Sequence, residues 1–406
     1  MTTARSIAVV GAGPAGLAVA LMLARQGRKV IVFERFDEPR PVGAGFMLQP
    51  TGLQVLDELG LGPAIAGLGQ PVHRLFGREA RRGRIVLDVR YDALKGSRPA
   101  LGVLRAAVFQ TLYDACLAES IDFRPSHAIV AANDGRLTDV RGRDLGRFDL
   151  VVDASGARSA IARGLPCRGP TGVRRDLVWG ALWTTVPWPG ADFDDAALEQ
   201  VYRSADRMIG VLPSGMRPSG FGPDTSDRTA TFFWSLKADD HGRWKSEGLD
   251  AWKAEVLSLW PRTAPVLEAI TDPEALTLAR YGHHTLTRPV GPKLAVIGDA
   301  AHSTSPQLGQ GVNMALLDAR ALALALDAAP DLDAALSAYA RTRRLHLALY
   351  QALSLVFTPF YQADGRLLPW VRDHILGKVA RLPFADRLLA ATVSGLLLDP
   401  IGERRD

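Results

Sequence analysis

Short apolar runs alternate with helical patterns at both ends of the chain. Residues 7–10 and 29–33 have the length and composition of buried strands, and the apolar segment 17–25 between them predicts a helix. The same order recurs further along, where 294–297 predicts a buried strand and 314–327, rich in Ala and Leu, predicts a helix. Strands that alternate with helices favour a parallel sheet covered by helices.

The middle of the chain has a different pattern. Strand-like runs follow one another there without long helices between them, at 177–186, 199–208, 209–212 and 229–236. Pro/Gly clusters at 213–215 and 218–220 punctuate these runs, as is typical of antiparallel hairpins. Helices are predicted afterwards, at 250–260 and 264–270. The middle segment therefore predicts a second, mixed or antiparallel sheet.

The turn after the first predicted strand carries a dinucleotide fingerprint, Gly11-Ala12-Gly13-Pro14-Ala15-Gly16. Gly11 allows the tight turn, Gly13 lets the backbone approach a pyrophosphate, and Gly16 lets helix and strand pack closely. The second predicted strand ends at Glu34, whose carboxylate can hold ribose hydroxyls, and Arg35 follows it. Together these features predict a dinucleotide site, although the motif alone does not distinguish FAD from NAD.

A second motif follows the strand predicted at 294–297. Gly298 and Asp299 place a carboxylate at the strand tip, where it can bind a ligand hydroxyl. The start of the next helix exposes backbone N–H groups that form an anion site, and its residues are Gly309, Gln310, Gly311, Val312 and Asn313. A sugar-like hydroxyl beside a diffuse negative charge fits the ribityl chain and the N1/C2=O edge of a flavin.

The pairing of the two motifs resembles the FAD-dependent (group A) flavoprotein monooxygenases of the para-hydroxybenzoate hydroxylase family, and the similarity spans essentially the whole chain. The family pattern GDAAHxxxPxxGQGxN is present in full at 298–313. The resemblance implies that the first motif holds the ADP half of a non-covalently bound FAD and the second its ribityl chain and ring. It also implies that Arg105 contacts the phosphate–ribityl region and that Pro306 packs over the flavin as part of the catalytic site.

The middle motif departs from the family pattern. Where the family has Gly-Ala-Asp-Gly followed by Ser and Arg, this chain has Ser155 at the Asp position, Gly156 after it and Ala162 at the usual Arg position. We expect Ser155 and Gly156 still to contact FAD. Asp153 could replace the missing carboxylate only if the loop shifts, so the departure bears on how the pyridine nucleotide is used.

The resemblance implies hydroxylation of an organic ring compound, with NADH or NADPH as electron donor and O₂ as co-substrate, through a flavin C4a-hydroperoxide. The chain has no second GxGxxG fingerprint, so we expect NAD(P)H to bind transiently over the flavin cleft. The alternative is a flavin-dependent reductase or dehydrogenase of a lipophilic alkene or isoprenoid, because related folds carry a Ser-Gly version of the middle motif. A flavin-binding scaffold or redox sensor is a third, non-enzymatic hypothesis.

Apolar and aromatic residues of the strand-like runs are candidates for the substrate pocket. Few charged residues occur in these runs, so we expect an apolar aromatic or ring-containing substrate rather than a small carboxylate. The predicted substrate contacts are Met47 from the loop 43–49, together with Trp183, Tyr202, Leu212 and Trp234. Arg207 aligns with a family arginine near the flavin and substrate and is a second catalytic candidate, whereas His302 is expected to be structural.

These observations predict an α/β fold in which a substrate domain is inserted into a Rossmann-like FAD-binding domain. The discontinuous FAD-binding domain is predicted at 1–70, 100–165 and 280–330. The substrate domain, with its mixed or antiparallel sheet, is predicted at 71–99 and 166–279. A C-terminal helical segment is predicted at 331–406.

Composition narrows the alternatives. The 406 residues are 47% apolar and 22% charged, which allows two domains with a core each. Cys116 and Cys167 lie far apart and lack metal spacing, so neither a disulfide framework nor a metal site is predicted, and a cytoplasmic location is expected. The net charge of +5 comes without a basic–aromatic block, which leaves nucleic-acid binding unsupported. No apolar run is long enough to span a bilayer, while a peripheral membrane contact and a monomeric or homodimeric state stay open.

Overall fold

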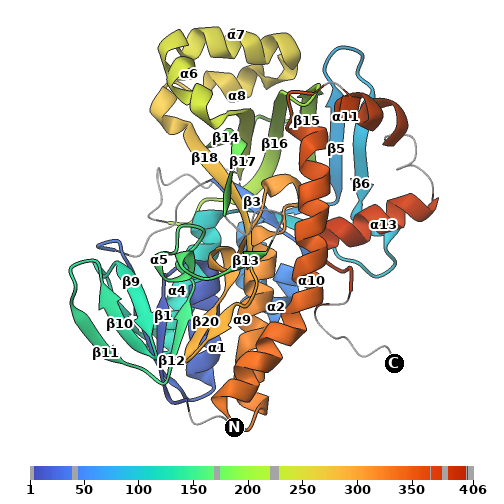
Figure 1. Cartoon of the computed structure of the whole chain (residues 1–406). Helices are drawn as coiled ribbons and strands as arrows, with labels where there is room; N and C mark the ends of the chain where they lie inside the picture. The colour runs from blue at the N-terminus through green and yellow to red at the C-terminus, as the bar shows by residue number, and fades with distance from the viewer. Residues whose placement is uncertain are drawn as a thin grey trace.

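The computed structural model describes residues 4–38, 44–168, 174–219, 228–365, 367–376, 383–398 and 400. Figure 1 shows two sheets, one in the lower half of the view and one in the upper half, with the long helix α10 (Leu332–Tyr361) running beside both. Gly43 of the predicted pocket loop 43–49 and Gly220 of the cluster 218–220 lie outside the described residues.

A six-stranded sheet forms the lower part, in the order β19-β20-β12-β1-β2-β8. All neighbours in it are parallel except β19 and β20. Its strands are β1 (Ser6–Val10), β2 (Lys29–Phe33), β8 (Asp122–Arg124), β12 (Leu150–Asp153), β19 (Val290–Gly291) and β20 (Leu294–Val296). The strands predicted at 7–10, 29–33 and 294–297 are confirmed, because short β-branched runs fit a sheet that is buried on both faces.

Different layers cover the two faces of this sheet. Ile7 and Val9 belong to a core shared with α1 (Pro14–Arg25), α4 (Arg105–Ala118) and α9 (Gly311–Ala328). Ala8 and Val10 point the other way and pack with a three-stranded antiparallel sheet of β9 (Ile129–Asn133), β10 (Arg136–Asp139) and β11 (Asp144–Arg147). Because β1 and β12 run parallel, the first glycine turn, which follows β1, lies at the carboxyl ends of both strands.

Two smaller groups of elements connect this sheet to the upper part. An antiparallel three-stranded sheet has the order β3-β7-β4, from β3 (Gly45–Leu48), β7 (Ala100–Leu104) and β4 (Gln70–Val72). Helices α2 (Pro50–Glu58) and α3 (Gly62–Leu68) follow β3, and the short α5 (Ala160–Arg163) follows β12.

The upper part is a nine-stranded mixed sheet with the main order β13-β18-β14-β17-β16-β15-β5-β6, and β21 also pairs with β18. Its strands are β5 (Arg74–Glu79), β6 (Ile85–Arg90), β13 (Cys167–Arg168), β14 (Arg175–Pro187), β15 (Ala197–Arg203), β16 (Arg207–Met216), β17 (Arg228–Lys237), β18 (Thr277–Leu286) and β21 (His302–Ser303). The predicted strands 177–186 and 229–236 are confirmed. The boundary drawn at residue 280 falls inside β18, which belongs wholly to this sheet.

Two details of the predicted hairpins are wrong. The run 199–208 is two strands, since a turn with Ser204 at φ +52° separates β15 from β16. The cluster Pro213-Ser214-Gly215 lies inside β16, at a bulge opposite β17. β15 pairs with β16 only as far as Glu199↔Val211, so Pro213 does not interrupt that ladder, and Gly215 adopts the φ of +68° that the bulge needs.

Helices close the molecule at its upper and right sides. The predicted helices at 250–260 and 264–270 correspond to α7 (Leu249–Leu259) and α8 (Ala264–Glu268), which with α6 (His241–Glu247) cover the outer face of the large sheet. The C-terminal part supplies α10, α11 (Leu367–Val371) and α13 (Pro383–Ser394). Among the described residues no helix is both long and apolar enough to cross a bilayer.

Candidate functional site

The first glycine turn is packed too closely for side chains at two of its positions. Gly11 has a φ of +101°, and a Cβ there would lie 2.7 Å from the Ala154 carbonyl oxygen. A Cβ on Gly16 would lie 1.9 Å from the carbonyl oxygen of Gly11. These contacts fix the turn against the end of β12 and against the first turn of α1.

The third glycine has a different environment. A Cβ on Gly13 would meet no described atom within 4 Å, and its φ of −76° is accessible to any residue. Gly13 caps α1, which begins with Pro14, Ala15 and Gly16, and the first N–H groups of a helix have no intrahelical acceptor. This end of α1 can therefore receive a phosphate group close to the backbone.

The acid at the end of β2 is tied to the same turn. The Glu34 carboxylate is 8% exposed and accepts hydrogen bonds from the backbone N–H of Ala12 at 2.8 Å and of Phe36 at 3.1 Å. A carboxylate has further lone pairs, so Glu34 can still accept from a ribose hydroxyl. Arg35 is exposed, with its guanidinium 4.7 Å from the ring centroid of Phe36.

Asp153 stabilises the loop of the middle motif through hydrogen bonds. It is fully buried, and its two carboxylate oxygens accept from the hydroxyls of Ser155 at 2.6 Å and Ser159 at 2.5 Å. Burial raises the pKa of Asp153, and these hydrogen bonds oppose the rise. Asp153 therefore holds the loop rather than replacing an exposed carboxylate. Ser155 and Gly156, the latter at φ +85°, follow it on the side that packs against Gly11.

The second motif brings a carboxylate and a helix start together. Gly298 adopts a φ of +60°, and Asp299 lies near α9, with one carboxylate oxygen 3.8 Å from where a Cβ on Gly311 would be. Asp299 is exposed. The surrounding protein raises the pKa of its carboxyl, and the charges of His302 and Arg105 oppose this. Asp299 is thus placed to accept from ligand hydroxyls beside the positive end of α9.

The side chains at the start of α9 fix the adjoining loops. Asn313 is fully buried: its Nδ2 donates to the Gly309 carbonyl at 2.9 Å, and its Oδ1 accepts from the Gln49 N–H at 2.9 Å. Gly309 has a φ of +61°. The Gln310 side chain points toward the C-terminal helix α13 and donates to the Val393 carbonyl at 2.6 Å. Gln310 and Asn313 therefore hold the loop by their side chains, which leaves backbone groups at Gly311 and Val312 for a ligand.

A buried ionic network lies behind this turn. The fully buried Asp318 accepts from the Gly298 N–H at 2.9 Å, from Arg343 Nε at 2.7 Å and from His302 Nε2. Burial alone would raise the pKa of Asp318, but the charges of His302 and Arg343 outweigh it and lower the pKa to about 2. His302 thus has a structural contact, as expected. Asp318 and Arg343 were not predicted as site residues; the one signal in the sequence is that Asp318 follows the apolar run 314–317 at the start of α9.

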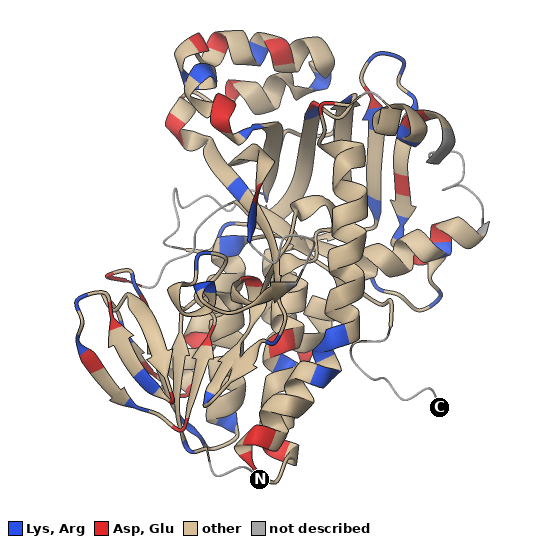
Figure 2. Cartoon of the chain, viewed as in Figure 1, with Lys and Arg blue, Asp and Glu red and all other residues tan. Residues whose placement is uncertain are grey.

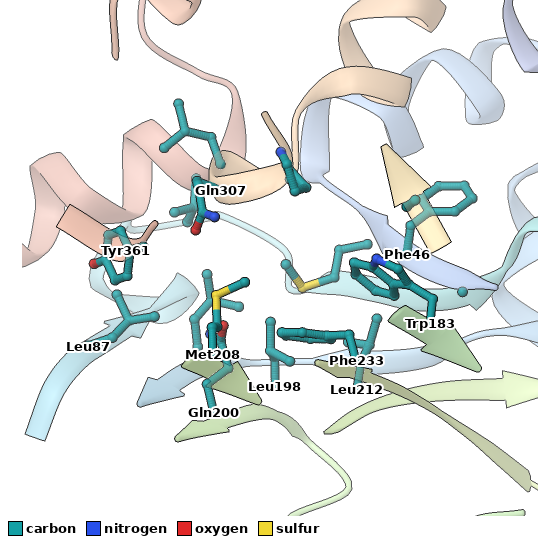
Figure 3. Close-up of a pocket in the computed structure, with 18 of the residues that line it drawn as sticks. Phe46, Leu87, Trp183, Leu198, Gln200, Met208, Leu212, Phe233, Gln307 and Tyr361 are labelled. Carbon is teal, nitrogen blue, oxygen red and sulfur yellow. The ribbon is translucent and has the colours of Figure 1, made fainter. Parts of the chain in front are cut away.

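A cavity of about 450 Å³ adjoins the loop that contains Pro306. Figure 3 shows it between strands of the large sheet, which contribute Leu198, Gln200, Met208, Leu212 and Phe233, and the elements that carry Gln307 and Tyr361. Of the predicted substrate contacts, Met47, Trp183, Tyr202 and Leu212 line it, as do Arg105 and Pro306. Among the described residues of this lining, Arg105 is the one with a charged side chain, and desolvation by the surrounding protein lowers the pKa of its guanidinium.

Few polar groups reach into this cavity. Trp183 Nε1 donates to the Tyr281 hydroxyl at 2.8 Å, which satisfies the indole N–H. Gln307 Nε2 is buried and has no hydrogen-bond partner among the described residues. Gln200, 8% exposed, also lines the cavity. Residues that sequence analysis did not assign to the pocket include Gln200, Gln307, Tyr281, Tyr361 and Val393, which come from segments distant in sequence.

Two predicted site residues lie on the wrong face of the large sheet. Side chains alternate along β16, so Met208 and Leu212 face the cavity while Arg207 faces away. Arg207 pairs with Glu255 of α7 at 3.0 Å and stacks over Trp234 at 5.5 Å. Trp234 in turn packs against Trp252 beneath α6–α8. Neither residue lines the cavity, and both are removed from the candidate site.

The residues of the two motifs fit FAD. Gly13 and the start of α1 could receive the pyrophosphate, Glu34 could hold the adenosine ribose, and Asp299 with the start of α9 could hold the ribityl chain and the flavin edge. Bound there, FAD would supply electron transfer to O₂. The described residues contain no cluster of three or more His, Cys, Asp or Glu that could hold a metal ion.

Comparison with known proteins settles the family. The family model described as an FAD binding domain matches residues 4–350 of this chain. The chain belongs to the FAD-dependent group A flavoprotein monooxygenases. The predicted family, the α/β fold class and the assignment as an FAD-dependent monooxygenase of the aromatic hydroxylase type are therefore confirmed.

Similar proteins in this family act on ring compounds. The chain is 29% identical to a 3-amino-4-hydroxybenzoate 2-monooxygenase from Streptomyces cremeus, over 80% of this chain and 79% of the relative. It is 26% identical to a probable 2-heptyl-3-hydroxy-4(1H)-quinolone synthase, AqdB2, from Rhodococcus erythropolis, over 94% of this chain and 92% of the relative. The fold matches Klebsiella pneumoniae HpxO complexed with FAD and uric acid, with a TM-score of 0.78, 20% identity and 98% of both chains covered.

Proposed function

We propose that this flavoprotein monooxygenase hydroxylates an uncharged, largely apolar ring compound, with NADH or NADPH as the electron donor and O₂ as the oxidant. The proposal rests on the composition of the cavity beside Pro306: of the lining residues that the structure describes, Arg105 alone is charged, and most of the others are aliphatic or aromatic. A volume of about 450 Å³ suits a compound of two rings or one ring with an alkyl chain.

The chain's own residues would bind and orient such a substrate. Apolar walls, among them Leu198, Met208 and Phe233, exclude water from the reacting face. The amides of Gln200 and Gln307 can each hydrogen-bond to a ring carbonyl, N–H or hydroxyl, which gives the substrate a fixed orientation. The similarity to the probable quinolone synthase AqdB2 along most of both chains supports a substrate with these properties.

Arg105 and the cofactor contacts are part of the same proposal. The Arg105 guanidinium lies 5.2 Å from the Phe46 ring centroid, and Asp299 is close enough to influence its pKa. We assign Arg105 to the phosphate–ribityl region and Pro306 to the wall over the flavin, where it adds no N–H donor. Gly11, Gly13, Gly16, Glu34, Asp299 and the start of α9 would hold the rest of FAD.

Substrate-stimulated turnover tests the proposal. The FAD-loaded protein would be assayed for NADH and NADPH oxidation, O₂ consumption and product mass with 2-alkyl-4(1H)-quinolones, phenols and polycyclic aromatics, and with benzoates as the charged comparison. We expect an uncharged ring compound to stimulate both consumption rates and to gain one oxygen atom. Stimulation by carboxylates alone would contradict the proposed substrate class, and no oxygen gain with any ring compound would contradict the reaction.

A further inference from the structure

A second cavity, of about 740 Å³, lies between α10 and the edge of the large sheet. Its walls come from the start of β14, from β18 and the residues after it, and from the part of α10 between Ala340 and Leu355. No residue that the structure describes lines both this cavity and the one beside Pro306. The two cavities are therefore separate sites.

The charges around this second cavity have one sign. Among the described residues, five arginines and no carboxylate line it, and the arginines are Arg175, Arg288, Arg341, Arg343 and Arg344. Arg343 is paired with Asp318, but the other four side chains make no ion pair with any residue that the structure describes. Figure 2 shows the corresponding blue region on the lower half of α10. Unpaired positive charge around a recess attracts anions.

Buried polar atoms without partners belong to the side chains that line the same cavity. Arg343 Nη2, His302 Nδ1 and Gln351 Oε1 have no hydrogen-bond partner among the described residues. Their side chains are 1%, 0% and 6% exposed, so bulk water does not satisfy them. Buried polar groups are nearly always hydrogen-bonded in native proteins, and three orphaned atoms around one recess point to a polar ligand there.

The remaining walls are apolar. Leu177, Leu286, Leu347 and Leu355 line the cavity together with Pro289 and several alanines. A small inorganic ion would leave most of this surface without a partner. The combination of arginines, which recognise carboxylate and phosphate oxygens, with apolar walls suits an organic anion that has an apolar body.

We propose that this cavity binds an organic anion in which a carboxylate or phosphate is attached to an apolar or aromatic body. The anionic group would contact Arg343 Nη2 together with the exposed Arg341 and Arg344. Asp318 accepts hydrogen bonds both from Arg343 and from the Gly298 N–H, so two hydrogen bonds link Arg343 to the turn that carries Asp299. Two kinds of compound combine an anionic group with such a body, a nucleotide and an amphiphilic carboxylate.

Calorimetric titration of the FAD-loaded protein distinguishes these sources. One arm uses ADP-ribose, which has a pyrophosphate and no nicotinamide, and the other uses decanoate. The test variant is Arg341→Ala/Arg344→Ala, at two exposed positions where folding should be preserved. The matched control is Arg136→Ala/Arg147→Ala, two exposed arginines of the β9–β11 sheet.

We expect at least one probe to bind the wild type saturably and to bind the test variant about tenfold or more weakly, while the control binds as the wild type does. Binding of ADP-ribose alone would identify a nucleotide site, and binding of decanoate alone an amphiphile site. Failure of both probes to bind, or equal affinity for the wild type and the test variant, would overturn the proposal. These results are independent of hydroxylation, which the oxygen-gain assay measures.

Discussion

Two glycines three residues apart in the first turn have different physical roles. Gly16 is required by the protein itself, because a Cβ there would lie 1.9 Å from the Gly11 carbonyl oxygen. Gly13 has no described atom within 4 Å of its Cβ position and a φ that other residues adopt readily. The fold itself therefore does not require a glycine at position 13. We infer that glycine is needed there because a cofactor approaches the backbone closely.

The substitutions Gly13→Ala and Gly16→Ala should therefore have separable effects. We expect Gly13→Ala to leave the free energy of unfolding of the apoprotein within about 0.5 kcal/mol of wild type and to weaken FAD binding at least about tenfold. Gly16→Ala should lower that free energy by about 1–3 kcal/mol through overpacking. Urea unfolding and FAD fluorescence titration measure the two quantities. Equal loss of stability in both variants would refute the distinction.

At the scale of the element, the alternation of side chains along β15 and β16 decides which residues can meet the substrate. Leu198, Gln200 and Tyr202 of β15 face the cavity, as do Met208 and Leu212 of β16. Val201, Ile209 and Val211 face the core beneath α6–α8 instead. Arg207 is one residue from Met208 and lies on the opposite side of the sheet, where Glu255 pairs with it.

This alternation predicts opposite outcomes for Gln200→Leu and Arg207→Ala. We expect Gln200→Leu to raise KM for the substrate about five- to tenfold, the value of one lost hydrogen bond, with little change in FAD content. Arg207→Ala should keep kcat/KM within about twofold of wild type. Steady-state kinetics with the ring compound that gives product would measure both. A loss of kcat/KM in Arg207→Ala as large as in Gln200→Leu would contradict the conclusion that Gln200 contacts the substrate and Arg207 does not.

At the scale of the whole molecule, a buried polar network joins α9, α10, the Gly298 turn and the C-terminal segment. Arg343 connects Asp318 to His346, with Nη1 3.4 Å from His346 Nδ1, and His346 Nε2 donates to the Gly395 carbonyl at 3.1 Å. Burial, together with the positive charge of Arg343, lowers the pKa of His346 to about 4. Burial also lowers the pKa of His284, on β18, to about 4.

These two histidines make the stability of the fold sensitive to mild acid. An unfolded histidine takes up its proton below about pH 6.5, whereas the folded form stays neutral until about pH 4. The unfolded state therefore binds more protons between these values, and stability falls as the pH falls through this window. Asp318, with its pKa lowered to about 2, contributes stability above about pH 4 that is lost as the pH falls toward 2.

We expect the wild type to have a lower free energy of unfolding at pH 5 than at pH 7. In His346→Gln, which keeps a donor for the Gly395 carbonyl, this difference should shrink by up to about 2 kcal/mol. The control is His73→Gln at an exposed position, where the difference should equal that of the wild type. Urea titrations at the two pH values give the free energies. An undiminished difference in His346→Gln would rule out this residue as the source.

The local pattern of apolar residues predicted correctly those elements whose bounds are set by residues adjacent in sequence. β2 has the predicted bounds of 29–33, and β1, β20 and α1 were predicted within a few residues, because short apolar runs and a glycine turn define them locally. The pattern failed at 199–208 and at Pro213. The turn between β15 and β16 has neither Gly nor Pro, and the acceptability of Pro213 depends on which strand lies beside it.

By itself, the sequence determined the two motifs that fit FAD, the class of the fold and the family, since backbone turns and strand tips are encoded by adjacent residues. Only the tertiary structure decided which side chains share a cavity. Gln200, Tyr281, Gln307 and Val393 converge from distant segments, and Arg207 and Trp234 turn away because a side chain's face depends on the register of its strand. Arg175 and Arg288 likewise come close to the three arginines of α10 only when that helix packs beside β18.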